Sequence, residues 1–144
     1  MPDGTILAFD YGSARTGTAV GNTVTGTATP LQTIATNNKE QRLLAIDTII
    51  KDWQPARLLL GLPLSAAEQA PELLGEIKNF GKELKKRYAL PVDYIDESNS
   101  SVDANRRLKQ QRQQGRRKKV NKLEIDQQAA VIILERWLEQ QHAK

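Results

Sequence analysis

Carboxylates at the ends of predicted strands are the side chains in this chain best suited to chemistry. Asp10 follows the apolar run at residues 6–9, and Asp96 and Glu97 follow the run at residues 91–95. In an open α/β sheet, functional groups gather at the carboxyl ends of the strands. Acids at these positions are also common turn and cap formers, so neither position is decisive alone.

A third acid lies on the inward face of a predicted helix. Asp126 shares one helical stripe with four apolar residues at i+3, i+4, i+7 and i+11: Ala129, Ala130, Ile133 and Trp137. Burying a lone carboxylate costs several kcal/mol unless it is paired or binds a cation. An acid near a helix N-terminus can also stay solvated and gain about 0.3–1 kcal/mol from the helix dipole. The pattern leaves both interpretations open.

Three converging carboxylates would suit a hard divalent cation such as Mg²⁺, which prefers oxygen ligands. Two such ions about 3.5–4 Å apart can activate a water and stabilise the leaving oxygen of a phosphodiester. The composition fits this chemistry, because the chain has no Cys and one His, His142. Disulfides, thiolate zinc sites and cysteine nucleophiles are excluded, and sites that need several His residues are disfavoured.

Nine short segments must position these acids. Apolar runs and turn signals predict strands at residues 6–9, 16–20, 25–29, 58–60 and 91–95, with a hairpin turn at Gly21-Asn22 and a stop at Pro30. Helical spacing predicts helices at residues 40–53, 71–88, 101–111 and 123–140, with Trp53 and Trp137 in the core. The order β-β-β-α-β-α-β-α-α predicts an α/β fold. It is a five-stranded mixed sheet flanked by helices, with its first three strands antiparallel.

The length of 144 residues predicts a single domain over residues 1–144, because no linker or repeat divides the chain. No apolar run approaches the roughly 20 residues of a membrane span, and the first residues do not resemble a signal peptide. We therefore expect a cytoplasmic protein without a membrane partner.

Positive charge is concentrated in one segment, at residues 106–122. It holds nine of the 21 basic residues and no acid, whereas the rest of the chain carries 12 basic and 17 acidic residues. Such clustering favours a phosphate-rich partner, although a solvated loop that aids solubility is the alternative. The candidate nucleic-acid contacts in it are Arg106, Arg107, Arg112, Arg116, Arg117, Lys118 and Lys119.

Five motifs, in order along nearly the whole chain, resemble one known family. Residues 10–19, DYGSARTGTA, resemble the opening D-x-G-[ST]-x-R-x-G-x-A of the YqgF family. Its members are described as pre-16S rRNA nucleases and as RuvC-like Holliday junction resolvases. The remaining matches are ATPL at residues 28–31, GLPL at 61–64, DESNSSVDA at 96–104 and DQQAAVIIL at 126–134.

The resemblance implies an RNase H-like nuclease in which Asp10, Glu97 and Asp126 are catalytic and bind Mg²⁺ or Mn²⁺. It also implies a role in maturation of the 5′ end of pre-16S rRNA, with ribosomal particles as partners. One alternative is a Holliday junction resolvase that cuts branched DNA, and cutting a two-fold symmetric junction would require a homodimer rather than a monomer. Another is a non-catalytic RNA-binding factor in ribosome assembly.

One departure from the family pattern and two residues of the first motif bear on how substrate is held. Ser98 stands where the family usually has Arg, so the bidentate phosphate contact of a guanidinium is missing there. Arg106 or Arg107 could replace it. Ser13 could hydrogen-bond a phosphate, and Arg15 either faces substrate or pairs with a neighbouring acid.

Overall fold

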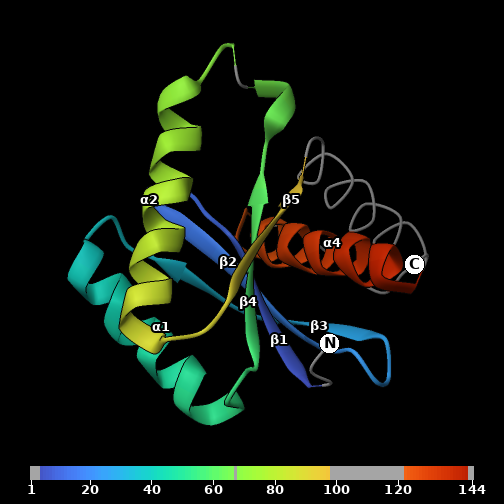
Figure 1. Ribbon diagram of the computed structural model, residues 1–144. Coiled ribbons are helices and arrows are strands. Elements are labelled where there is room, and N and C mark those ends of the chain that lie inside the picture. The colour runs from blue at the N-terminus through green and yellow to red at the C-terminus, as the bar shows by residue number, and fades with distance from the viewer. Residues whose placement is uncertain (1–3, 67, 98–121, 143–144) are drawn as a thin grey trace, which may run out of the picture.

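A five-stranded mixed sheet forms the centre of the computed structural model, which describes residues 4–66, 68–97 and 122–142. The spatial order of the strands is β3-β2-β1-β4-β5 (Figure 1). Their bounds are β1 (Thr5–Asp10), β2 (Arg15–Asn22), β3 (Thr27–Ala35), β4 (Arg57–Leu62) and β5 (Val92–Asp96). The five strands and their order along the chain agree with the sequence-based prediction.

Strand direction divides the sheet into two halves. The strands β1, β2 and β3 pair antiparallel, as predicted, whereas β1, β4 and β5 pair parallel. The carboxyl ends of β1, β4 and β5 therefore lie along one edge of the sheet. Asp10 and Asp96 are the last residues of two of these strands.

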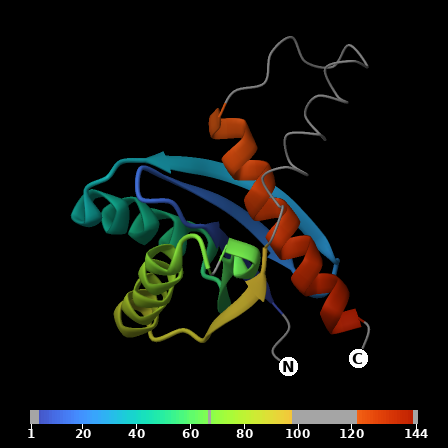
Figure 2. The ribbon, with the colours of Figure 1, turned by 90° about the horizontal axis from the view of Figure 1, so that it is seen from above.

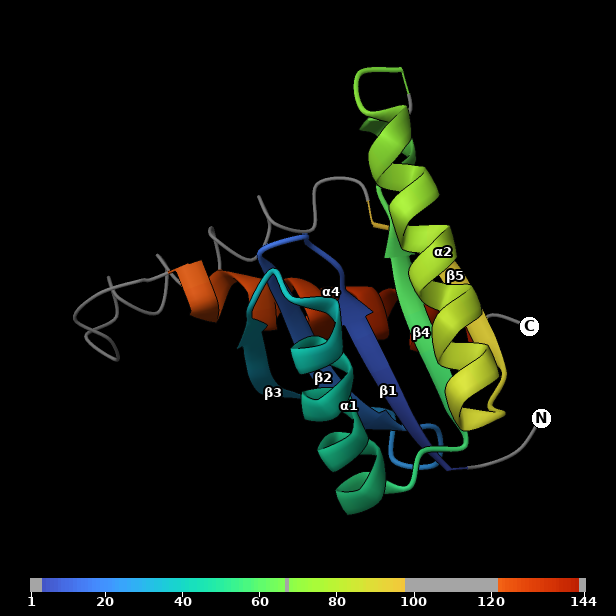
Figure 3. The same cartoon turned by 90° about the vertical axis from the view of Figure 1, so that its left-hand side faces the viewer.

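Helices cover both faces of the sheet. The helices α1 (Lys39–Trp53) and α2 (Pro71–Tyr88) lie on one face, and α4 (Lys122–His142) crosses the other (Figures 2 and 3). A short 3-10 helix, η1 (Leu64–Ala66), follows β4. The helix α1 begins after Asn38, whose side chain accepts a hydrogen bond from the Gln41 backbone N–H, and α2 begins with Pro71 in its first turn.

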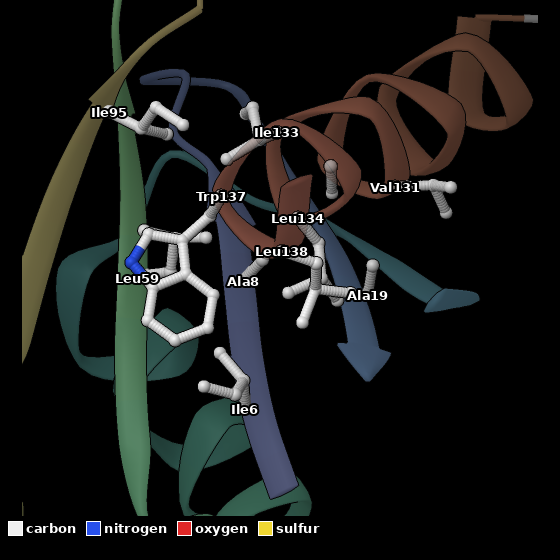
Figure 4. Packing of buried hydrophobic residues seen from close by; sticks show 11 residues of the cluster. Ile6, Ala8, Ala19, Leu59, Ile95, Val131, Ile133, Leu134, Trp137 and Leu138 are labelled. Carbon is white, nitrogen blue, oxygen red and sulfur yellow. The ribbon is translucent and has the colours of Figure 1, made fainter. Parts of the chain in front are cut away.

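Alternation along the strands divides the core into two layers. On β1, Leu7 and Phe9 face the α1 and α2 side, whereas Ile6 and Ala8 face α4. Figure 4 shows Trp137 of α4 beside Ile6, Ala8 and Leu59, and Trp137 is 4% exposed, as predicted. None of the helices in the described residues is long and apolar enough to cross a membrane.

The predicted end of the third strand is wrong. The strand β3 continues through Pro30 to Ala35, and the turn before it spans residues 23–26 rather than Gly21-Asn22. Proline lacks a backbone donor but is tolerated at a sheet edge or a bulge. Both apply here, because β3 is the edge strand and its register with β2 shifts between Gly17 and Ala19.

The predicted burial of Trp53 is also wrong, since its side chain is 45% exposed. The buried stripe of α1 consists of Arg42, Ile46 and Ile49. Trp53 is the last residue of the helix, and Gln54 turns the chain away with a left-handed φ of 45°. The predicted helix at residues 101–111 lies outside the described residues.

Candidate active site

Asp10 and Glu97 project from the same face of the sheet. Asp10 has the strand parity of Ala8, and Glu97 has that of Ile95, and both Ala8 and Ile95 pack against α4. Glu97 continues the strand pairing beyond β5, because its backbone N–H donates to the Leu62 carbonyl. Asp96, with the opposite parity, is exposed, whereas Glu97 is only 7% exposed. Alternation therefore selects Glu97 over Asp96 as the partner of Asp10.

A glycine brings the third acid to this point. Gly17 on β2 pairs in register with Asp10, and a Cβ at Gly17 would overlap the backbone carbonyl of Asp126. The first turns of α4 can approach the sheet this closely only because position 17 is a glycine. Any residue with a Cβ at that position would collide with the backbone of Asp126. Gly61 plays a similar part on β4, where a Cβ would collide with the side chains of Glu97 and Ile133. We call Asp10, Glu97 and Asp126 the acidic site.

Electrostatic repulsion is strong in the acidic site. Burial raises the pKa of Asp10 well above its ordinary value, and the charge of Glu97, a hydrogen bond to Glu97 and the charge of Asp126 raise this pKa further. Asp10 thus lies within hydrogen-bond reach of one carboxylate and within the field of another. The negative charges of Glu97 and Asp126 near Asp10 are the part of this environment that favours a cation.

Arg15 contacts one of the three acids. Its Nε donates to Oδ2 of Asp126 at 2.8 Å, and the two side chains are 39% and 17% exposed. Asp126 is therefore a paired, largely buried acid rather than a solvated one. Arg15 pairs with this neighbouring acid. The ion pair turns the Asp126 carboxylate toward β2.

The donors of the acidic site fit a hard divalent cation, since all three are carboxylates and they repel one another. No three His, Cys, Asp or Glu side chains of the described residues stand close enough together to hold one ion, and Asp126 is engaged by Arg15. Binding an ion with all three acids therefore requires a change of the Asp126 side chain.

The predicted nucleic-acid contacts are placed in part. Ser13 lies exposed in the loop after β1, and Arg15 begins β2 beside the acidic site. The remaining candidates lie outside the described residues: Arg106, Arg107, Arg112, Arg116, Arg117, Lys118 and Lys119. Ser98, the departure from the family motif, lies outside them too.

Sequence analysis missed Arg42, a buried arginine of α1. It is 6% exposed, and its Nη2 donates to the carbonyl oxygens of Ser13 at 2.6 Å and Thr36 at 3.2 Å. Its guanidinium also lies 5.1 Å from the centre of the Tyr11 ring. Arg42 thereby braces the loop that follows Asp10. The available signal was a charged residue four positions before Ile46 on an otherwise apolar stripe.

Comparisons with known proteins agree with this geometry. A family model described as "RuvX: Holliday junction resolvase" matches residues 4–140. A protein of Dechloromonas aromatica named "Putative pre-16S rRNA nuclease" is 41% identical over 139 residues, which cover 96% of this chain and 93% of the relative. A protein of the same name from Xanthomonas euvesicatoria is 39% identical, over 95% of this chain and 88% of the relative.

Solved structures share the fold at low sequence identity. T. thermophilus RuvC in complex with a Holliday junction substrate superposes with a TM-score of 0.60 at 12% identity, covering 96% of both chains. The yeast mitochondrial Holliday junction resolvase Ydc2 superposes with a TM-score of 0.53 at 10% identity, covering 95% of this chain and 78% of that one. The sheet and its helices therefore have the RNase H-like arrangement of RuvC.

Proposed function

The chain belongs to the RuvX family, and from that premise we propose that it is a metal-dependent endonuclease that hydrolyses phosphodiester bonds in structured RNA. The proposed substrate is pre-16S rRNA at its 5′ end, in line with the names of the two relatives. The observation that carries the proposal is the buried contact between Asp10 and Glu97, with the charge of Asp126 acting on it.

In this proposal Asp10, Glu97 and Asp126 are the catalytic residues and would hold Mg²⁺ or Mn²⁺. When bound, such an ion supplies an activated water and stabilises the charge of the leaving oxygen. The protein contributes a wall with little access to water, since Glu97 is 7% exposed and Asp10 is half-buried. The ion pair with Arg15 compensates the charge of Asp126, and Asp126 would have to turn away from Arg15 to share in holding the ion.

We propose that substrate phosphates meet the basic residues of this chain. Ser13 and Arg15 lie on the loop and strand next to Asp10, where their exposed parts can reach a phosphate. The basic residues of segment 106–122 would neutralise the backbone further along. Each phosphate contact made by Lys or Arg releases condensed counterions, so binding should weaken steeply as salt rises.

A second candidate is cleavage of branched DNA, favoured by the description of the family model and by the RuvC-like fold. The two activities differ in symmetry. A four-way junction is cut in matched strands, which requires a homodimer that presents two acidic sites. A protein that remains monomeric on its substrate and cuts RNA would exclude it. For either activity we propose a cytoplasmic location.

The test uses purified full-length protein with Mg²⁺ or Mn²⁺ and two substrates, an RNA with the 16S precursor leader and a four-way DNA junction. We expect Asp10→Asn and Asp126→Asn to lower cleavage about a thousandfold, because the metal effect amounts to several kcal/mol. Asp47→Asn is the matched control, since this acid lies on α1 and bonds to Arg87 and Tyr88 outside the acidic site.

The outcomes separate the candidates. RNA cleavage that both acidic-site variants lose and the control retains supports the proposal. Junction cleavage with the same dependence supports the second candidate. Equal cleavage by all variants would contradict both and indicate a contaminating nuclease. Salt-sensitive RNA binding without cleavage by the parent would instead identify a non-catalytic assembly factor.

A further inference from the structure

A cavity of about 330 Å³ opens on the opposite face of the sheet from the acidic site, between α1, α2 and the loop after β1. Figure 3 shows these two helices side by side on that face. The volume is at the lower end of the range for small-ligand pockets. Among the residues that line it are Tyr11, Ser13, Asn37, Arg42, Asn79 and Phe80.

The cavity begins one residue beyond Asp10. Strand parity directs Asp10 toward α4, whereas Tyr11 packs with the α1 and α2 cluster. The acidic site and the cavity therefore lie on the two sides of one chain segment. A strand of nucleic acid that crosses this edge of the sheet would touch both.

Flat aromatic surfaces form one wall of the cavity. The rings of Tyr11 and Phe80 lie 4.9 Å apart with a tilt of 41°, and the Arg42 guanidinium lies over Tyr11. Aromatic and guanidinium planes are the surfaces on which unpaired nucleobases stack. Two amides, Asn37 and Asn79, supply donors and acceptors of the kind that pair with base edges.

A buried donor in the cavity lining lacks an acceptor. Arg42 is 6% exposed and its Nε has no hydrogen-bond partner among the described residues. Leaving a buried donor unpaired is costly, and more so for a charged group. Because this Nε is enclosed, a ligand with a carbonyl oxygen or ring nitrogen would accept from it only after a small movement of the Arg42 side chain.

Charge favours a neutral ligand in this cavity over a free phosphate. Lys39 and Glu83 form an ion pair across the lining at 2.5 Å. The lining as a whole has two basic side chains, Lys39 and Arg42, and two acidic ones, Glu76 and Glu83, so its formal charge is zero. A dianion would find no excess of positive charge here, whereas a flat polar base would find stacking and hydrogen bonds.

We propose that this cavity receives an unpaired nucleobase of the substrate, from a nucleotide adjacent to the phosphate held at the acidic site. The inference deepens the proposed nuclease function and rests on it for the identity of the strand. The base stacks on Tyr11, accepts from Arg42 and pairs with an Asn side chain. The cavity thus selects substrates in which a base near the cleaved bond can leave its helix.

The first test measures binding of labelled RNA, in EDTA to prevent cleavage, by fluorescence anisotropy. One RNA is intact and the others lack a single base near the cleavage position while keeping every phosphate. We expect removal of the correct base to weaken binding by the parent protein about tenfold, as for loss of one stacked base. Equal binding of all these RNAs would overturn the proposal.

A second experiment tests whether the base that affects binding contacts Asn79, by combining a protein variant with the abasic RNA. Asn79→Ala should weaken binding of intact RNA about fivefold and leave binding of the abasic RNA unchanged, because its partner is already missing. Thr48→Ala is the matched control: Thr48 is exposed on α1, and its hydroxyl donates to the Leu44 carbonyl. Equal loss on both RNAs would contradict contact between Asn79 and the base.

A photochemical cross-linking experiment tests the contact between the base and Tyr11 in the unmutated protein. RNA carrying 5-iodouracil at the sensitive position should cross-link to the peptide that contains Tyr11, and mass spectrometry identifies that peptide. Cross-links confined to other peptides would overturn the proposal. Competition by free uridine would show that the base alone suffices, and resistance to it would show that the strand must deliver the base.

These readouts are independent of cleavage. If base-dependent binding and the Tyr11 cross-link appear while the parent protein cuts nothing, the cavity stands and the proposed nuclease function fails. If the protein cuts RNA but ignores removal of every nearby base, the nuclease function stands and the cavity proposal fails.

Discussion

Two clusters in this protein each contain a carboxylate in close contact with its neighbours. The neighbours lower the pKa of the carboxylate in one cluster and raise it in the other. Between α1 and α2, Asp47 accepts hydrogen bonds from Arg87 at 2.8 and 2.6 Å and from the Tyr88 hydroxyl at 2.5 Å. These bonds, first that of Arg87, lower the pKa of Asp47 to about 2. In the acidic site, burial and two other acids raise the pKa of Asp10 well above its ordinary value.

The difference is the one we expect between a structural carboxylate and the catalytic carboxylate that we propose. The Asp47 cluster is complete, because its donors stabilise the charged form and join two helices. In the acidic site, burial and repulsion act against the charged form of Asp10, which supports the proposal that this site binds a cation. Natural proteins retain such unfavourable charge arrangements mainly at functional sites.

The largest expected effect comes from altering the backbone contact that assembles the acidic site. Gly17→Ala places a Cβ against the Asp126 carbonyl, so α4 must shift away from Asp10. We expect a loss of about 3 kcal/mol in the free energy of unfolding, as for overpacked cores, and loss of cleavage. Urea denaturation and the RNA cleavage assay measure the two effects.

Gly75→Ala on α2 is the matched control, because a Cβ there meets no atom within 4 Å. It should stabilise the protein by about 0.5–1 kcal/mol, since alanine is the better helix former. If both glycine variants behave alike, the close approach of α4 at Gly17 is not a constraint on this fold.

The second prediction concerns the cation that we propose for the acidic site. At a Mg²⁺ concentration about 100 times its dissociation constant, the parent protein should gain about 2.7 kcal/mol of stability. Thermal denaturation with and without EDTA measures the gain. Asp10→Asn should abolish it and Asp47→Asn should retain it. A gain of equal size in all three proteins would point to a metal site elsewhere.

The third prediction follows from the raised pKa of Asp10. The unfolded chain ionises this acid near 3.8 and the folded protein resists ionisation, so stability should fall as the pH rises above about 4. Asp10→Asn should remove this fall and be about 1 kcal/mol more stable at neutral pH. Unfolding curves over a pH series test it, and an unchanged profile would refute strong repulsion at Asp10.

The smallest effect is expected at Asp47, whose pKa shifts in the opposite direction. Its contribution to stability should be fully present above pH 3.8 and lost as the pH falls toward 2. Asp47→Asn should lower the Tm by no more than a few degrees at neutral pH, because the pair is exposed and screened by solvent. A drop as large as that of Gly17→Ala would contradict this comparison.

Local pattern was enough to predict most of the fold. Apolar runs and helical stripes predicted the strands of the sheet, the helices α1, α2 and α4, and the inward face of Asp126, because burial requires these periodicities. They failed where tertiary position decides the outcome. Pro30 is tolerated within β3 because that strand is at the edge, and Trp53 is exposed because α1 ends there.

By itself, the sequence determined which acids end the strands and which helix carries the third, because strand ends and helical faces are local properties. The family resemblance had already named Glu97 beside Asp10. Only the tertiary structure decided that Arg15 pairs with Asp126 and that Arg42 is buried beneath the loop after β1. Each of these contacts joins segments distant along the chain. Their geometry depends on strand order and on how closely α4 can approach Gly17.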